Sequence, residues 1–401
     1  MIQSEASLID TDPAELADPH ALAARLGVRA GTVRLGQTRI AVSSTDPRAV
    51  TYLHDLFTPA NDIWEHLPDD FSPCSLTAVN LAVSDACFER LVDHYAAQAV
   101  RRQAVHLHVA APGIRYEMAD GTWAVVSEPD EIDGTNLVVQ SPRGLVFVTT
   151  ARPYAHLALA RHLREFGYRR GESDGWAGLH ASCAATPEGN VVVIGRSGAG
   201  KSTTALALAA ASGCGFVAND RVMVRVEGEQ VTACGMPVPI RINGGTMHAL
   251  GLKDATSWQL TRRQPDFVTS DWQNFCGDSK LNLLPVEWRA RTGTALVPSV
   301  RLTAIVLPHV TKDSAVLSVR RVGPDEAREV LAEQLMTPDD DVFVEDWLHA
   351  RTRDRDEIGA LAGRTFEALM RLPILVTELG TRNTLVNLSS SIREALGTLR
   401  G

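Results

Sequence analysis

The residues with the clearest chemical potential lie together in a glycine-rich stretch near the middle of the chain. An apolar run, VVVI, precedes this stretch and an alanine-rich run follows it. Between them, two glycines with four residues between them are followed by a lysine and a serine, which is the spacing G-x-x-x-x-G-K-[ST]. Backbone N–H groups of such a loop, at the start of a helix, bind phosphate. The pattern predicts a phosphate-binding loop formed by Gly195, Arg196, Ser197, Gly198, Ala199, Gly200, Lys201, Ser202 and Thr203.

The side chains of this loop predict a nucleotide triphosphate with a metal ion as the ligand. Lys201 is expected to reach the β- and γ-phosphates, and the Ser202 hydroxyl to bind Mg²⁺. Thr203 would support the α-phosphate, and the loop glycines would allow positive φ and a close approach of the phosphates. A tight glycine turn without a ligand is the alternative. It is disfavoured because the loop, the lysine, the hydroxyl and both flanking elements agree.

A second metal-side carboxylate is expected at the end of a nearby strand. The segment CGFVAND runs apolar through Ala218 and then gives Asn219 and Asp220. One helix and one strand separate Asp220 from Lys201, so a right-handed crossover would bring Asp220 back to the loop. The alternative is an ordinary aspartate in a turn. A GTPase or a transporter ATPase is disfavoured, since the chain has no S-G-G-Q segment and no N-K-x-D spacing.

The elements that position these residues predict an α/β protein in two parts. Residues 1–150 form an expected α+β lobe, with a hairpin at 31–45, a helix at 46–57, a loop at 59–73, helical spacing over 91–100 and a mostly antiparallel sheet. Residues 151–401 form an expected catalytic domain. Its helices include 154–167, with Leu159, Leu163 and Phe166 on one face and Gly167 at its end, and a helical stretch over 342–370. Residues 1–20 are polar and are expected to be poorly ordered.

Composition excludes several classes of protein. The 401 residues are 45% hydrophobic and carry a formal net charge of −9, which suits a folded chain with no nucleic-acid partner. The six cysteines form no C-x-x-C pair and are interpreted as reduced thiols. The N-terminal residues lack a signal-peptide pattern and no apolar run would span a membrane, so a cytoplasmic location is expected. The oligomeric state stays open, a homo-oligomer included.

Other polar residues give weaker signals. His106 and His108 alternate on an expected strand, but no third metal ligand follows. Arg241, Lys280 and Arg321 are cations that either contact a phosphate or an acidic acceptor, or simply lie on the surface. The polar stretch 256–280, which contains DWQNF, is either a lid or a disordered insertion. The acidic run 339–341 is interpreted as a solvated turn.

The segment around the loop resembles the bacterial HPr serine kinase/phosphorylase family. The matching residues are His180 before the loop, the loop itself from Gly195 to Ser202, and Asn219-Asp220-Arg221-Val222. The resemblance is strongest over 180–225. It implies a P-loop kinase core related to ATP-dependent phosphoenolpyruvate carboxykinase. It also implies that His180 supports the phosphate site, and that the acids at the strand end bind Mg²⁺ and activate an acceptor serine.

Two departures from the family pattern narrow the expectation. Asn219 stands where the family has the first acid of a pair, and an amide cannot accept a proton. The segment MPVPIRINGG does not match the glycine-rich segment tied to dephosphorylation of HPr, so neither phosphorylase activity nor HPr as substrate is expected. The chain looks more like the kinase-related proteins associated with peptide modification.

The sequence therefore predicts an enzyme, an ATP- and Mg²⁺-dependent kinase that acts on a hydroxyl. The expected acceptor is a serine or threonine of a peptide or small protein. The alternatives are a small-molecule hydroxyl kinase and an ATP-binding regulatory module. The expected catalytic residues are Asp220, His180 and Lys201, and the expected metal ligands are Ser202, Asp220 and Asn219.

Overall fold

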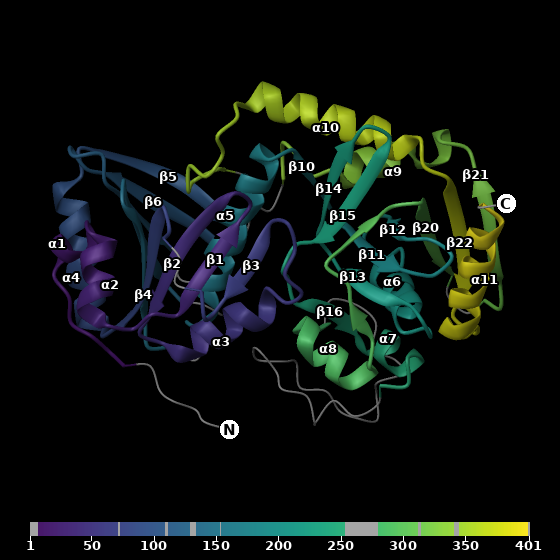
Figure 1. Ribbon diagram of the computed structural model, residues 1–401, viewed down its shortest axis with the longest axis horizontal. Coiled ribbons are helices and arrows are strands. Elements are labelled where there is room, and N and C mark those ends of the chain that lie inside the picture. The colour runs from purple at the N-terminus through teal and green to yellow at the C-terminus, as the bar shows by residue number, and fades with distance from the viewer. Residues whose placement is uncertain are drawn as a thin grey trace. The chain divides into compact units, whose positions relative to one another are not determined.

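The chain folds as a mixed α/β protein with several sheets (Figure 1). The structure is a computed structural model, and it describes residues 7–70, 73–108, 111–128, 134–152, 154–252, 280–311, 314–340 and 345–399. The chain packs into two units. The first contains Met1–Phe57, Ile63–Asp174 and Asp339–Thr352, and the second contains Thr58–Asp62, Gly175–Pro338 and Arg353–Gly401.

The division between the units differs from the boundary expected at residue 150. Helix α5 (Leu157–Ser173) packs on α3 (Pro47–Leu56) and β1 (Gly31–Leu35), so it belongs to the first unit. Leu159, Leu163 and Phe166 of α5 are buried, as their spacing predicted. Because α5 buries this face within the first unit, the long second-unit segment begins at Gly175 and not near residue 150.

A nine-stranded sheet forms the centre of the first unit among the described residues. Its order is β3-β1-β2-β4-β9-β8-β7-β6-β5. Strand β4 runs parallel to β2 and β9, and the other neighbours are antiparallel, which confirms the mostly antiparallel sheet and the hairpin at β1–β2. The remaining strands are β2 (Thr38–Ser44), β3 (Trp64–Leu67), β4 (Leu76–Val83), β5 (Arg101–His108), β6 (Ala111–Glu117), β7 (Trp123–Ser127), β8 (Asn136–Ser141) and β9 (Gly144–Thr150).

Three expectations for this unit are wrong in detail. Strand β3 forms inside the expected loop at 59–73, because it pairs with β1 and buries Trp64. Helix α4 (Asp85–Gln98) begins before the helical spacing at Leu91, since Ser84 caps it. Gly167 lies inside α5 and does not end it. A Cβ at Gly167 would lie 2.3 Å from Trp64 Nε1, so the glycine makes room for the indole.

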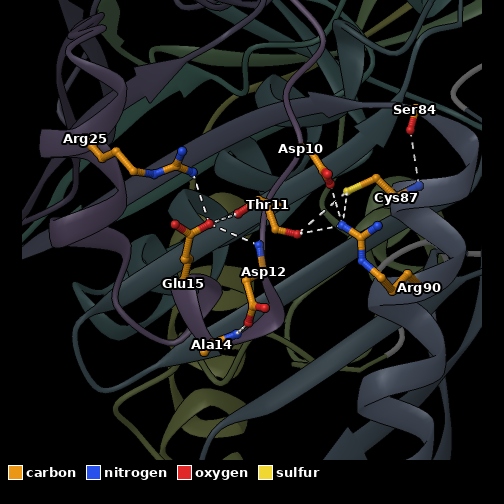
Figure 2. A network of polar contacts seen from close by, with 9 residues as sticks. All are labelled: Asp10, Thr11, Asp12, Ala14, Glu15, Arg25, Ser84, Cys87 and Arg90. Atoms are coloured by element: carbon orange, nitrogen blue, oxygen red, sulfur yellow. Dashed lines mark hydrogen bonds and ion pairs between the residues drawn. The ribbon is translucent and has the colours of Figure 1, made fainter.

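The N-terminal segment is tied down from Ser7 onward, contrary to the disorder expected over 1–20. Helices α1 (Pro13–Leu16) and α2 (Pro19–Leu26) follow it. Figure 2 shows Glu15 accepting hydrogen bonds from the Thr11 hydroxyl at 2.6 Å and from Arg25 at 3.1 Å. Arg90 of α4 forms an ion pair with Asp10 in the same network. These contacts fix the segment against α4 and α2.

The second unit contains a seven-stranded sheet, a four-stranded sheet and a two-stranded ribbon among its described residues. The seven-stranded order is β18-β13-β11-β12-β20-β22-β21, and the four-stranded order is β10-β14-β15-β19. Strand β11 runs antiparallel between β12 and β13, so β13 is not the direct neighbour of β12. The strands of the larger sheet are β11 (Ala181–Ala185), β12 (Val191–Ile194), β13 (Gly215–Ala218), β18 (Ala295–Leu296), β20 (Ala304–Thr311), β21 (Leu317–Val322) and β22 (Ile374–Gly380).

The remaining described elements of this unit are the strands of its two smaller sheets and its helices. The smaller sheet has β10 (Trp176–Leu179), β14 (Val222–Glu227), β15 (Gln230–Gly235) and β19 (Ser299–Arg301), and the ribbon has β16 (Ile240–Asn243) and β17 (Lys280–Leu283). The helices are α6 (Lys201–Ala209), α7 (Gly244–Ala249), α8 (Pro285–Thr292), α9 (Asp325–Gln334), α10 (Arg355–Met370) and α11 (Leu385–Thr398). Helix α10 begins at Arg355, so residues 345–354 of the expected helical stretch are not helical. Within the described part of the chain, no helix is long and apolar enough to cross a bilayer.

Candidate functional site

The glycine-rich loop connects β12 to α6, as the sequence predicted. Gly198 and Gly200 have φ of 78° and 102°, conformations that favour glycine. A Cβ at Gly200 would lie 2.6 Å from Val310 Cγ2, so the loop also needs glycine there for space. Gly195 does not adopt the positive φ that was expected of it. A Cβ at Gly195 would instead lie 3.1 Å from the Ala199 Cβ, and close packing within the loop explains the glycine.

A cavity of about 390 Å³ opens beside this loop. It brings together most of the residues that the sequence singled out, although they come from separate elements. Gly195, Ala199 and Asn219 are not among its lining residues. The predicted residues that line it are His180, Arg196, Ser197, Gly198, Gly200, Lys201, Ser202, Thr203 and Asp220.

Lys201 is the first residue of α6 and is nearly buried, with 9% of its surface exposed. Its Nζ donates hydrogen bonds to the carbonyl oxygens of Gly195 at 2.6 Å and Arg196 at 3.4 Å. Burial lowers the pKa of Lys201 to about 8, although the negative charge of Asp220 acts in the opposite direction. An ammonium group so poorly solvated gains more from an anion in the cavity than an exposed lysine would.

Asp220 follows β13 and has a φ of 69°, which is uncommon for a residue with a side chain. Its Oδ1 lies 3.5 Å from His180 Nε2, and its Oδ2 lies 3.7 Å from Arg221 Nε. Burial raises the pKa of Asp220, but the hydrogen bond with His180 and the charges of Arg221 and Arg241 outweigh it, so the pKa lies well below its usual value. The carboxylate is therefore ionised at neutral pH. A group of this kind suits cation binding better than proton abstraction.

Asn219 does not point into the cavity, unlike its neighbour Asp220. It is buried, and its Oδ1 accepts a hydrogen bond from Ser182 Oγ at 3.1 Å. Its Nδ2 has no partner among the described residues. The geometry thus does not favour the expected role of Asn219 as a metal ligand. Within the described ranges, no three His, Cys, Asp or Glu side chains form a cluster that would hold a metal by themselves.

Helix α9 forms ion pairs and hydrogen bonds with the beginning of the loop. The sequence did not predict this contact. The Arg196 guanidinium pairs with Glu329 at 2.7 Å and with Glu333 at 2.7 Å. The Gln334 carbonyl accepts a hydrogen bond from His180 N at 2.8 Å. With its amide nitrogen turned toward them, the Gln334 side chain also donates to the carbonyl oxygens of His180 and Gly195, at 3.2 Å and 3.1 Å. No local spacing in the sequence signals this role, because α9 has the pattern of an ordinary amphipathic helix.

Some of the other candidate residues line the cavity and some lie elsewhere. Arg241 and Lys280 line the cavity, whereas Arg321 lies exposed on β21 and does not. Thr246 of α7 also lines it, and its hydroxyl forms a 2.7 Å hydrogen bond with the Thr203 hydroxyl. His106 Nδ1 lies 3.4 Å from Glu345 Oε1 in the first unit.

Several expectations fall on residues that the structure does not describe. They are the His108 side chain, the segment with DWQNF, Asp341 and Cys276. The described cysteines, Cys74, Cys87, Cys183, Cys214 and Cys234, are free thiols, as expected. Burial raises the pKa of Cys183 and Cys234, so these two thiols are unreactive core residues.

Comparisons with known proteins give a distant structural likeness. No family model matches the chain, and no curated protein matches its sequence. The solved structures that match include the Hpr(Ser) kinase/phosphatase from Coxiella burnetii, at 12% sequence identity and a TM-score of 0.26. The match covers 56% of this chain and 99% of that chain. At this TM-score the likeness carries no argument about a reaction or a substrate.

Proposed function

We propose that this protein is a kinase that uses Mg·ATP to phosphorylate a hydroxyl group. One observation carries the proposal: Lys201 and Ser202 of the glycine-rich loop line the same cavity as His180 and Asp220. Phosphoryl transfer needs a cradle for the polyphosphate and a polar group beside the acceptor oxygen. The loop supplies the first, and the His180–Asp220 pair supplies the second.

The charges of the cavity fit a polyanion held with a divalent cation. Lys201, Arg241 and Lys280 line the cavity, and Asp220 is its one carboxylate among the described lining residues. The Ser202 hydroxyl and the Asp220 carboxylate would hold Mg²⁺ together with phosphate oxygens. When bound, the metal would offset negative charge on the phosphates. Lys201 would leave its loop carbonyls to bind the β- and γ-phosphates.

The transfer itself would break the bond between the γ-phosphorus and the β,γ-bridging oxygen and form a bond between the γ-phosphorus and the acceptor oxygen. ADP leaves with the bridging oxygen, and the acceptor hydroxyl gives up its proton. Asp220 would orient this hydroxyl, and His180, at 3.5 Å from Asp220, stands where it would help remove the proton. The lowered pKa of Asp220 favours this division of roles.

We further propose that the acceptor is a serine or threonine of a peptide or small protein. The resemblance around 180–225 to HPr serine kinases supports this choice, and a cytoplasmic location would go with it. The first unit would contribute to acceptor binding, and the second would carry the transfer. A small-molecule hydroxyl is the alternative acceptor. An ATP-binding module without transfer is the second candidate function, favoured by Asn219 in place of an acid.

The test is transfer from Mg·[γ-³²P]ATP to a degenerate peptide library with a central serine or threonine, alongside a panel of small alcohols and sugars. We expect phosphorylation that Lys201→Met and Asp220→Asn each reduce at least about 100-fold, a typical loss for a positioned catalytic group. Arg321→Gln, a cation outside the cavity, is the matched control and should keep full activity. Calorimetry with the non-hydrolysable analogue AMP-PNP separates the candidates.

The results distinguish a kinase from a binding module and test the role of Asp220. A protein that binds Mg·AMP-PNP but phosphorylates no probe acts as a binding module. A protein that binds no nucleotide is not a kinase of this type. Full transfer by Asp220→Asn would show that the assignment of Asp220 is wrong.

A further inference from the structure

The ribbon β16–β17 presents two different faces. Ile240, Ile242, Leu281 and Leu283 are buried in a hydrophobic cluster with Met247 and Trp288. The alternate residues share the other face, because side chains alternate along a strand. In the ladder Arg241 pairs with Asn282, and Asn243 pairs with Lys280, so these four residues lie on one face. Arg241, Asn243 and Lys280 line the cavity beside the glycine-rich loop.

The two cations of this face have no carboxylate partner among the described residues. Other arginines of the second unit are committed to carboxylates: Arg196 to Glu329 and Glu333, Arg320 to Glu326, and Arg393 to Glu188. Together with Lys201, the two ribbon cations give the cavity an excess of positive charge over its one described carboxylate, Asp220, and this excess raises the local concentration of anions there.

The two cations lie near both functional parts of the cavity. One part is Asp220, which would orient the acceptor, and the other is Lys201, which would bind the phosphates. Arg241 is close enough to Asp220 to contribute to the lowered pKa of that carboxyl. Lys280 is close enough to Lys201 to contribute to the lowered pKa of that lysine. The loop amides, Lys201 and Mg²⁺ already provide for the polyphosphate of the proposed nucleotide. The ribbon therefore adds positive charge beyond what that nucleotide requires, next to the carboxylate that would orient the acceptor.

We propose that Arg241 and Lys280 form an anion subsite that binds a negatively charged group of the acceptor, a carboxylate or a phosphate, near the hydroxyl that is phosphorylated. This proposal rests on the proposed kinase function. It restricts the acceptor to hydroxyl compounds with an anionic neighbour, such as a serine in an acidic peptide. Asn243, on the same face, would add a hydrogen bond to the anion.

The test uses inorganic phosphate as the probe anion and calorimetry on the full chain. Protein saturated with Mg·AMP-PNP should still bind phosphate, because the loop is then occupied and the ribbon is free. Arg241→Gln and Lys280→Gln should each weaken phosphate binding at least tenfold and change the affinity for Mg·AMP-PNP less than threefold. Arg321→Gln removes an exposed cation of the same unit outside the cavity and should change neither. Thermal unfolding of each variant checks that the protein remains folded.

Three results would overturn the subsite. Phosphate that fails to bind the nucleotide-saturated protein, or binds all variants equally, would show that the ribbon holds no second anion. A loss of Mg·AMP-PNP affinity in Arg241→Gln as large as in Lys201→Met would assign the cation to the nucleotide instead. Failure of the wild-type protein to bind Mg·AMP-PNP is a different result, since it would contradict the kinase proposal and not the subsite alone. The peptide library gives a further check, because acidic residues beside the phosphorylated serine should then be enriched.

Discussion

At the scale of single residues, Lys201 shows how position changes chemistry. A lysine at a protein surface stays protonated well beyond neutral pH. Lys201 is nearly buried at the start of α6, and among the described residues its ammonium donates hydrogen bonds to the carbonyl oxygens of Gly195 and Arg196. Burial lowers its pKa to about 8. Without a bound anion the side chain thus loses its charge at a lower pH than a surface lysine would, a little above neutral pH.

This state of Lys201 predicts a pH dependence of nucleotide binding. Phosphate favours the charged ammonium, so Mg·AMP-PNP binding should take up a proton above pH 8, and affinity should fall as pH rises, approaching tenfold per pH unit. Below the lowered pKa the lysine is already charged, so its titration should no longer make the affinity depend on pH. Calorimetry at pH values of about 7 to about 9.5, in two buffers of different ionisation enthalpy, measures both effects.

Lys201→Arg is the matched variant for this prediction. The arginine keeps its charge throughout this range, so any remaining affinity should lose its dependence on pH. An affinity of the wild-type protein that is constant from pH 7 to 9.5 would contradict the assignment of a lowered pKa.

At the scale of secondary structure, α5 and β3 depend on each other through one glycine. The Trp64 indole of β3 donates a hydrogen bond from Nε1 to the Arg164 carbonyl oxygen at 3.1 Å, so it lies directly against α5. Gly167 gives it room there. A helix normally loses stability at an interior glycine, and here packing of a buried tryptophan outweighs that loss.

Substitution of this glycine should therefore destabilise the first unit. Gly167→Ala would place a methyl group 2.3 Å from Trp64 Nε1, and we expect a loss of about 1–3 kcal/mol, as for other overpacked cores. Gly363→Ala is the control, since a Cβ at that helical position of α10 meets nothing within 4 Å. It should stabilise the protein by about 0.5–1 kcal/mol. Urea unfolding followed by tryptophan fluorescence measures both, and a stabilising Gly167→Ala would refute this explanation.

At the scale of the whole chain, the two units exchange short segments. Thr58–Asp62 belongs to the second unit, and Asp339–Thr352 belongs to the first. The second segment is anchored by Arg351, whose Nε lies 2.6 Å from the buried Glu172 Oε2, and by Trp347, which contacts Trp123 and His162 edge to face. Residues far apart in sequence thus complete the core of the first unit.

This exchange predicts which unit a mutation will disturb. Trp347→Ala should cost about 3–5 kcal/mol, the usual range for a buried aromatic residue. Hydrogen exchange should accelerate in peptides of α5 and β7 and stay unchanged in β12 and α6. Trp288→Ala, in the ribbon cluster of the second unit, should accelerate exchange in β12 and α6 and leave α5 and β7 unchanged. Equal acceleration in both units by Trp347→Ala would contradict the assignment of its segment to the first unit.

The sequence alone determined the features that are contiguous in the chain. The loop from Gly195 to Thr203, its preceding strand and its following helix were predictable because the spacing of their residues is itself the structural requirement. The hairpin at β1–β2 and the helix capped by Asp46 follow from equally local patterns. Asp220 was predictable because the helix after the loop is followed by an apolar strand that ends just before this residue.

Only the tertiary structure decided what depends on contacts between distant segments. Arg241 and Lys280 were weak candidates until the ribbon β16–β17 placed them at the cavity, while Asn219 turned toward Ser182 instead. The support of the loop by Gln334 and α9, the place of Gly167 inside a helix and the exchange of Asp339–Thr352 gave no local signal. Each depends on a partner more than 100 residues away or on the shape of a neighbouring side chain, and no periodicity in one segment encodes such a partner.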